Sequence, residues 1–320
     1  MDQSSLGLIY REVLALYHNG LDSLDPQDMH FPDFSDWLFH TFDHRAELQK
    51  KQLEFWTETL KDVQPTYLFS STPSEEPLSD LTEIEATVDA TTLALCHSFM
   101  KEIGATASEG FFAVYNTLLY HYSSQETMVV GTTFTQRNTA QLANVVGPLT
   151  TFIPIKTTVD PNQTFQEYIT GFRADLSKSL ENGDVVYEDI NSEISEPSRC
   201  SGSFRHSFSY DGMNLDAISK LKMEGMEVKN FRTLSKTRDE NQELVLDIYG
   251  KTGRIILRFN NHIVSEERAR KFLDTYITFV DALCRSSDSK MCDLSVFNPV
   301  DIAPVSSLET TNLPAVTSTD

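Results

Sequence analysis

Residues 149–180 read LTTFIPIKTTVDPNQTFQEYITGFRADLSKSL, and this stretch decides the fold class. Its first eleven residues are rich in β-branched side chains, which predicts a strand. Thr164 and Glu167 then form a capping box ahead of apolar residues at helical spacing, which predicts a helix. A strand followed directly by an amphipathic helix is the building unit of α/β proteins.

Strands and helices also alternate before and after this stretch, and the alternation begins at Leu81. Further strands are predicted at 81–88, 127–134, 204–210, 227–234, 243–250 and 253–260, and helices at 91–103 and 108–122. Ser265 is predicted to cap a final helix. We therefore predict an α/β layered domain over residues 81–296.

The residues before and after this domain have a different character. An amphipathic helix is predicted over 5–18, with Gly20 as its stop, and a long charged helix over 45–63. Residues 65–80 are rich in Pro and Ser and read as a linker, and residues 297–320 read as a disordered tail or a second linker.

Composition excludes several function classes. The net charge of −21, from 47 acidic and 26 basic residues, argues against nucleic acid and anionic membranes as partners, because both need a basic surface. No run approaches the roughly 18–20 apolar residues of a membrane span, and the first twenty residues are too polar for a secretory signal. We expect a cytoplasmic protein. The four cysteines lack metal-ligand or CxxC spacing, so no metal and no disulfide are predicted.

Familiar catalytic motifs are missing from the sequence. There is no GxGxxG, GxxxxGK[ST], GxSxG or HExxH. One H-x-x-x-D match, His18 to Asp22, falls at the end of a predicted helix and reads as a chance match. His206 alternates with Phe204 and Phe208 on a strand and reads as a core or interface histidine rather than a base.

Several short stretches, taken in order, resemble the core motifs of condensation domains of nonribosomal peptide synthetases and fungal polyketide synthase hybrids. FPDFSDW at 31–37 resembles the aromatic-x-Asp-Phe-Ala-x-Trp motif, and VGTT at 130–133 with nearby Arg137 resembles Val-Gly-Thr-Pro followed by Gly-Arg. VGPLTTFIPIK at 146–156 resembles Val-Gly-x-x-x-Asn-x-x-Pro-Leu-Arg. NGDVVYE at 182–188 stands in the place of His-Gln-Asp-x-Pro-Phe-Glu, and residues 257–276 resemble the closing strand, turn and helix.

The resemblance also gives a meaning to the first residues. The family's active-site motif is His-His-x-x-x-Asp-Gly followed by an amphipathic helix, and MDQSS at 1–5 is similar to its end, with Asp2 as the motif Asp and Gln3 in the Gly position. Met-Asp-Gln is similar to the terminal condensation domains of lovastatin-type highly reducing polyketide synthases. Both histidines would then precede Met1, and residues 1–64 would be a remnant of the N-terminal lobe with the helices that connect the lobes.

The family resemblance implies a chloramphenicol-acetyltransferase-like lobe with a mixed sheet flanked by helices. In the family two such lobes form a V, and phosphopantetheine arms of carrier domains bring donor and acceptor to the second His, so no cofactor is bound directly. Asp2 would be structural and pair with a basic residue of the missing lobe. The substrate tunnel and lobe bridge would include these positions: Gln3, Ser4, Gly147, Thr151, Asp184, Tyr187 and Tyr210.

The sequence departs from the family pattern at five of the matched positions. Thr151 replaces Asn, Lys156 replaces Arg, Gly183 replaces Gln, Val186 replaces Pro and Tyr187 replaces Phe. We therefore expect altered or absent condensation activity.

Three hypotheses for the function are open from the sequence. The chain is the C-terminal part of a condensation domain and inactive alone, with the missing lobe and carrier domains as partners. Alternatively it is a non-catalytic module that binds a carrier domain or shapes a polyketide. The third hypothesis is a complete small acyltransferase that uses His18 or His206.

Overall fold

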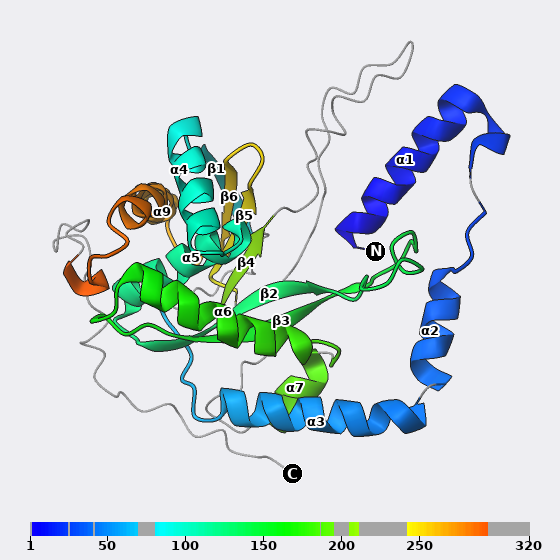
Figure 1. Ribbon diagram of the computed structural model, residues 1–320, viewed down its shortest axis with the longest axis horizontal. Helices are drawn as coiled ribbons and strands as arrows, with labels where there is room; N and C mark the ends of the chain where they lie inside the picture. The colour runs from blue at the N-terminus through cyan, green and yellow to red at the C-terminus, as the bar shows by residue number, and fades with distance from the viewer. Residues whose placement is uncertain are drawn as a thin grey trace.

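The computed structural model describes residues 2–24, 26–40, 42–69, 81–185, 187–194, 205–210 and 242–293, with backbone alone for residues 3, 38–40 and 42–45. Figure 1 shows a sheet covered by helices, with an arm formed by the first three helices beside it. The predicted strand at 227–234 and the predicted tail at 297–320 lie outside the described residues.

The sheet has six strands in the order β1-β6-β5-β4-β2-β3. The strands are β1 (Thr82–Thr87), β2 (Thr127–Thr135), β3 (Thr150–Thr158), β4 (His206–Tyr210), β5 (Leu244–Tyr249) and β6 (Arg254–Phe259). Strand β4 runs parallel to both β2 and β5, and the other neighbours are antiparallel. The sheet is therefore mixed, as expected.

Four helices pack together over the sheet: α4 (Ala90–Glu102), α5 (Ala107–Ser123), α6 (Phe165–Glu181) and α9 (Glu266–Arg285). The predicted capping box of Thr164 and Glu167 is present at α6, and Ser265 caps α9 through the Arg268 N–H. The ends of these helices were predictable because capping satisfies orphan N–H groups with neighbouring side chains.

Helix α5 is the centre of the hydrophobic core. Every residue from Gly110 to Leu119 is buried, so this helix is covered on all sides. The ring of Phe112 stacks on Phe208 of β4 with 4.4 Å between centroids, and the Tyr276 hydroxyl of α9 donates to the Phe111 carbonyl oxygen at 2.9 Å. The sheet, α5 and α9 are thereby joined in one core.

The arm contains α1 (Gln3–Asn19), η1 (Leu21–Ser23), α2 (Phe31–His40) and α3 (Phe42–Leu60). Helix α1 ends at Gly20, whose φ of 81° lies in the left-handed region, as the sequence predicts. Helix α3 begins three residues earlier than expected, and the motif FPDFSDW forms most of α2. Trp56 anchors α3 to the body, because its buried indole N–H donates to the Asn182 carbonyl oxygen at 2.8 Å.

Helix α1 leaves part of its apolar face uncovered. Leu8 is buried, but Val13 is 45% exposed and Tyr17 is 46% exposed, and Leu21 just beyond the helix is 87% exposed. Figure 1 shows α1 standing away from the sheet, with its N-terminus near the end of the β2–β3 hairpin. The helix is therefore held mainly at its beginning.

The first residues of the predicted linker are packed in the folded body. Thr66, Leu68 and Phe69 are buried, and the Phe69 N–H donates to Glu243 Oε1 at 3.0 Å. Residues 70–80 lie outside the described part of the chain. The short helices α7 (Tyr187–Glu193) and η2 (Met291–Asp293) complete the described elements, and α7 packs against α3 and β3.

None of the helices that the structure describes combines the length and apolar composition needed to cross a bilayer.

Candidate functional site

Asp2 begins helix α1 as its N-cap residue. Its Oδ1 accepts a hydrogen bond from the Ser5 N–H at 2.8 Å and lies 2.7 Å from Ser5 Oγ. A carboxylate in this position satisfies N–H groups that have no partner inside the helix and also interacts favourably with the helix dipole. The local sequence Asp-x-x-Ser therefore fixes where α1 starts.

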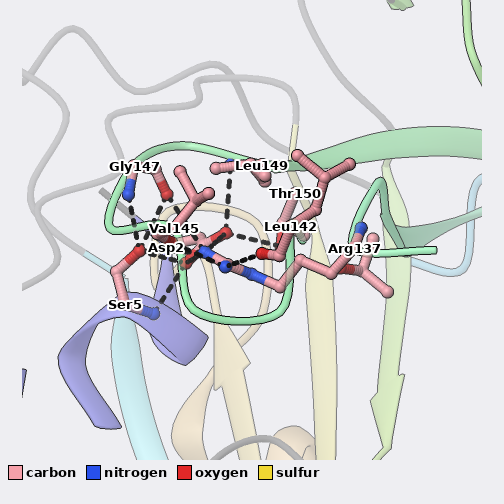
Figure 2. A network of polar contacts seen from close by, with 9 residues as sticks. Asp2, Ser5, Arg137, Leu142, Val145, Gly147, Leu149 and Thr150 are labelled. Atoms are coloured by element: carbon pink, nitrogen blue, oxygen red, sulfur yellow. Dashed lines mark hydrogen bonds and ion pairs between the residues drawn. The ribbon is translucent and has the colours of Figure 1, made fainter. Parts of the chain in front are cut away.

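Arg137 joins this helix start to the loop between β2 and β3. Its Nη2 lies 2.9 Å from Asp2 Oδ1 and 3.0 Å from Asp2 Oδ2, as Figure 2 shows. The Arg137 side chain is 8% exposed and the Asp2 side chain is 5% exposed. The pair is thus largely removed from water, where an unpaired charge is strongly unfavourable.

The start of strand β3 completes the set of donors around Asp2. The Leu149 N–H donates to Asp2 Oδ2 at 3.0 Å, and the Thr150 hydroxyl donates to the same oxygen at 3.2 Å. Ser5 Oγ also accepts a hydrogen bond from the Gly147 N–H at 2.9 Å and lies 2.8 Å from the Gly147 carbonyl oxygen. Helix α1, the loop and β3 therefore meet at one buried network (Figure 2).

Gly147 is required here because of a close approach. A Cβ atom on this residue would lie 2.2 Å from Cδ2 of the Phe31 ring and 2.9 Å from its Cβ. Phe31 in turn packs against the small apolar cluster of Phe34, Leu142, Val145 and Leu149. The loop can therefore lie against α2 only with glycine at this position.

The electrostatic state of Asp2 follows from two opposing effects. Burial on its own would raise the pKa of the carboxyl, because the charged form loses solvation. Hydrogen bonds from Ser5 and Arg137, with the charge of Arg137, outweigh burial and lower the pKa of Asp2 below its ordinary value. Asp2 is ionised at neutral pH.

The network suits a structural role for Asp2 and not an acid–base role. The acceptor positions of the carboxylate are taken by Ser5, Arg137, Leu149 and Thr150, which leaves little capacity to accept a proton from a substrate. No cluster of His, Cys, Asp or Glu that could hold a metal ion occurs among the residues described. The site as described is an anchor between segments.

One expectation for Asp2 is wrong. Its basic partner was expected in an N-terminal lobe, but the structure shows Arg137 of this chain in that role. The family motifs match Arg137 to the Arg of Gly-Arg, but they do not predict its partner. Ser5 was missed altogether, although its position three residues after Asp2 is the spacing of an N-cap interaction.

The other expected site residues lie in different parts of the fold. Gly147 belongs to the Asp2 network, whereas Ser4 is exposed in the first turn of α1 and Gln3 is described by its backbone alone. Thr151 lies on β3 opposite Phe134.

Asp184 and Tyr187 lie beyond the end of α6. Asp184 lines a pocket against α2 and α3, and Tyr187 begins α7 and lines a second, smaller pocket. Neither residue is among the partners of the Asp2 network described above.

Tyr210 lies elsewhere, on the helix-covered side of the sheet. Its ring stacks on Phe111 of α5 with 5.8 Å between centroids, and a Cβ on Gly250 would lie 1.8 Å from its hydroxyl oxygen. Tyr210 is therefore packed between the helix layer and the β5–β6 turn.

Neither histidine of the alternative acyltransferase hypothesis is placed as a base. His18 is exposed at the end of α1 beside Tyr17. His206 is buried, and its Nε2 lies 3.1 Å from the Thr66 carbonyl oxygen. Burial, followed by the charge of Arg205, lowers the pKa of His206 to about 3. His206 is a neutral core residue.

Known proteins are similar to this chain in sequence and in fold. The condensation-domain family profile matches residues 1–301. Gramicidin S synthase 2 of Brevibacillus brevis is 24% identical over 305 residues, which cover 93% of this chain and 7% of that protein. The chain therefore spans a small part of the synthase.

Solved structures share the fold. The condensation domain from Monacolin K polyketide synthase MokA matches with a TM-score of 0.72 at 17% identity, over 91% of this chain and 68% of that chain. The X-domain in its complex with OxyB from teicoplanin biosynthesis matches with a TM-score of 0.72 at 16% identity, over 93% of this chain and 68% of that one. The expected acetyltransferase-like fold is confirmed, and with a family profile that covers nearly its whole length the chain belongs to the condensation-domain family.

Proposed function

We propose that this chain is the C-terminal part of a condensation domain in polyketide or nonribosomal peptide biosynthesis. In the complete enzyme the domain transfers an acyl group from a carrier-bound thioester to an amine or hydroxyl acceptor. The observation that carries the proposal is the saturated Asp2 carboxylate, which ties the start of α1 to the loop of residues 136–149. This is the anchoring role implied by the resemblance to the end of the His-His-x-x-x-Asp motif.

In the proposed reaction the acceptor nitrogen or oxygen attacks the thioester carbonyl carbon. A C–N or C–O bond forms, the C–S bond breaks, and the phosphopantetheine thiol leaves with the proton from the acceptor. A histidine that precedes Asp2 in the complete domain is the proposed base, with neighbouring dipoles stabilising the oxyanion. Asp2 and Arg137 would hold the loop that carries this histidine.

The proposed partner of α1 is an N-terminal lobe of the same domain. Val13 and Tyr17 are each more than two fifths exposed, and a second lobe would cover such an apolar face. The matched condensation domain of MokA is longer than this chain, which spans 68% of it. Carrier domains of the same synthase are the proposed substrate donors.

A fungal polyketide context is the finer part of the proposal. Gln3 follows the motif Asp in the manner that resembles lovastatin-type synthases, and the MokA domain is a polyketide synthase domain of the same fold. We therefore place the domain at the end of a highly reducing polyketide synthase. Its donor would then be a polyketide thioester.

A non-catalytic module that binds a carrier domain or shapes the polyketide is the second candidate. It is favoured by the departures from the family motifs at Thr151, Gly183 and Tyr187. The X-domain, which has this fold, is solved in complex with OxyB, so the fold can serve as a binding surface in that protein. Under this candidate the chain binds carrier domains without transfer.

The deciding experiment begins with the natural transcript and the intact mass of the native polypeptide. If a His-His pair precedes Asp2 with three residues between the second His and Asp2, the whole domain is assayed by mass spectrometry for acyl transfer from a loaded carrier to an amine or alcohol. Transfer that disappears when the second His is replaced by Ala supports catalysis. A native chain that begins at Met1 and binds a carrier domain without transfer supports the second candidate.

The third hypothesis is tested with the chain as described. Replacing His18 and His206 together with Ala should leave any thioester transfer unchanged, because one is exposed on a helix end and the other is buried. Loss of transfer in a double variant that still folds would support the third hypothesis.

A further inference from the structure

The loop that carries the Asp2 network also forms one wall of a pocket. Five of its residues line a cavity of about 460 Å³, namely Gln136, Asn138, Thr139, Gln141 and Leu142. The other lining residues are Met29, Phe34, Trp37 and Leu48, on or next to α2 and α3, and Asp184 beyond the end of α6. Cavities of this size are typical of sites for small organic molecules.

The two walls differ in chemistry. The wall from the arm is apolar, and Trp37 and Leu48 keep 52% and 45% of their surface exposed. The loop wall is formed mainly by amide and hydroxyl side chains, which donate and accept hydrogen bonds without carrying charge. A ligand that satisfies both walls has an apolar body and uncharged polar groups.

Charge narrows the ligand class further. Asp184 is the one ionisable side chain among the described residues that line the pocket. Arg137 is nearby in sequence, but its Nη2 is committed to Asp2 and its Nη1 to the Leu142 and Val145 carbonyl oxygens. Among the described lining residues, a carboxylate or phosphate would therefore find no cationic partner and would face the Asp184 carboxylate, which is unfavourable.

The shape of the loop wall depends on the ion pair. Arg137 Nη1 donates to the Leu142 carbonyl oxygen at 3.0 Å and to the Val145 carbonyl oxygen at 2.6 Å. Asp2 holds the same guanidinium from the side of α1, as Figure 2 shows. Leu142 lines the pocket, and its backbone is held by Arg137, which is held in turn by Asp2.

We propose that this pocket binds an uncharged amphiphilic chain, with its apolar part against Phe34, Trp37 and Leu48 and its amide or hydroxyl groups along the loop wall. The Asp2–Arg137 pair acts as a positioning element for that wall. This proposal is about ligand binding only, so its test does not depend on the proposed acyl transfer.

The test is a titration of the full chain with N-(2-hydroxyethyl)decanamide and, separately, with decanoate. The sequence has two tryptophans, and Trp37 lines the pocket whereas Trp56 is fully buried in α3, so fluorescence reports on the site. The uncharged amide should give a saturable fluorescence change, and decanoate should bind at least about tenfold more weakly. The change should disappear in Trp37→Phe, with binding then followed by calorimetry.

Matched variants separate the pocket from non-specific adsorption. Leu48→Asp should weaken binding of the amide by about tenfold or more, whereas Leu180→Asp, at an exposed leucine outside the pocket, should leave it unchanged. Arg137→Ala should weaken binding while far-UV circular dichroism stays the same. Equal binding of amide and decanoate, or equal effects of Leu48→Asp and Leu180→Asp, would overturn the proposal.

Discussion

Arg137 Nη2 lies 2.9 Å from Asp2 Oδ1, although the two residues are 135 positions apart in the sequence. The same guanidinium holds the Leu142 and Val145 carbonyl oxygens. One side chain therefore fixes both the start of α1 and the path of the β2–β3 loop. Because α1 stands apart from the sheet in Figure 1, its attachment depends heavily on this contact.

Replacing Asp2 with Ala should release α1 and the loop locally. Loss of an N-cap costs about 1 kcal/mol, and breaking a buried ion pair by removing one partner costs up to about 3 kcal/mol more. We expect faster hydrogen exchange for the amides of α1 and of Leu149, with little change in α5, the centre of the core.

The control for this variant is Asp22→Ala, which removes an exposed acid from η1. It should leave the exchange of Leu149 unchanged. Equal exchange in Asp2→Ala and the parent protein would mean that the pair does not hold the loop.

The attachment of α1 should also depend on pH in a defined direction. The folded pKa of Asp2 is lowered, so its contribution to stability is complete above the ordinary aspartate pKa of about 3.9 and is lost as pH falls through the folded value. Protection of the Leu149 amide should therefore persist from neutral pH to about pH 4 and decline in more acidic solution. Loss of protection near pH 6 would contradict the assignment.

Local signals explain why much of the fold was predictable. The capping box of Thr164 and Glu167, the Ser265 cap and the stop at Gly20 each act within a few residues, so the sequence contains them in full. Pro32 in the first turn of α2 is an equally local signal, since proline is tolerated where its missing N–H has no partner.

The network and the pocket could not be predicted in the same way. Asp2, Arg137 and Leu149 come from a helix cap, a loop and the start of a strand, and only the folded chain brings their donors and acceptors together. The pocket needs α2, α3 and the loop at once. A family resemblance identified Asp2 as structural, but the partner had to come from the structure.

The uncovered face of α1 should make the isolated chain associate with itself. Exposed apolar patches of this kind mark surfaces that bind a partner. Replacing Val13 and Tyr17 with Ser removes two side chains that are nearly half exposed, so we expect a larger monomer fraction in analytical ultracentrifugation. Glu58→Ser, a change at an exposed polar position of α3, is the control. A monomeric parent protein would count against a missing lobe over this face.

His206 should influence stability through its protonation. Its pKa is lowered to about 3 by burial and by the charge of Arg205. The ordinary histidine pKa is about 6.5. Between these two pH values, His206 is protonated in the unfolded chain and neutral in the folded chain. Stability should therefore rise with pH across this window.

Urea unfolding at pH 5 and pH 7.5 measures this effect. His206→Gln, whose amide can still donate to the Thr66 carbonyl oxygen, should show a smaller loss of stability at pH 5 than the parent protein. His18→Gln, at an exposed histidine, should retain the loss of the parent. The same difference in all three proteins would show that His206 is not the group responsible.

Gly147 tests how closely the loop lies against α2, and Gly171 in α6 is the control. In Gly147→Ala the new Cβ would lie 2.2 Å from the Phe31 ring, so either the loop or α2 must move, and overpacking of this kind costs about 1–3 kcal/mol. In Gly171→Ala, inside α6, nothing lies within 4 Å of the new Cβ, and alanine should stabilise the helix by about 1 kcal/mol. Thermal unfolding and the exchange of Leu149 together distinguish the two, because Gly147→Ala should loosen the network locally. Adding Phe31→Ala to Gly147→Ala removes the two ring atoms that clash and leaves only the 2.9 Å contact with Cβ, so it should restore much of the protection of Leu149. If the double variant exchanges as fast as Gly147→Ala, the contact between Gly147 and Phe31 is not what positions the loop.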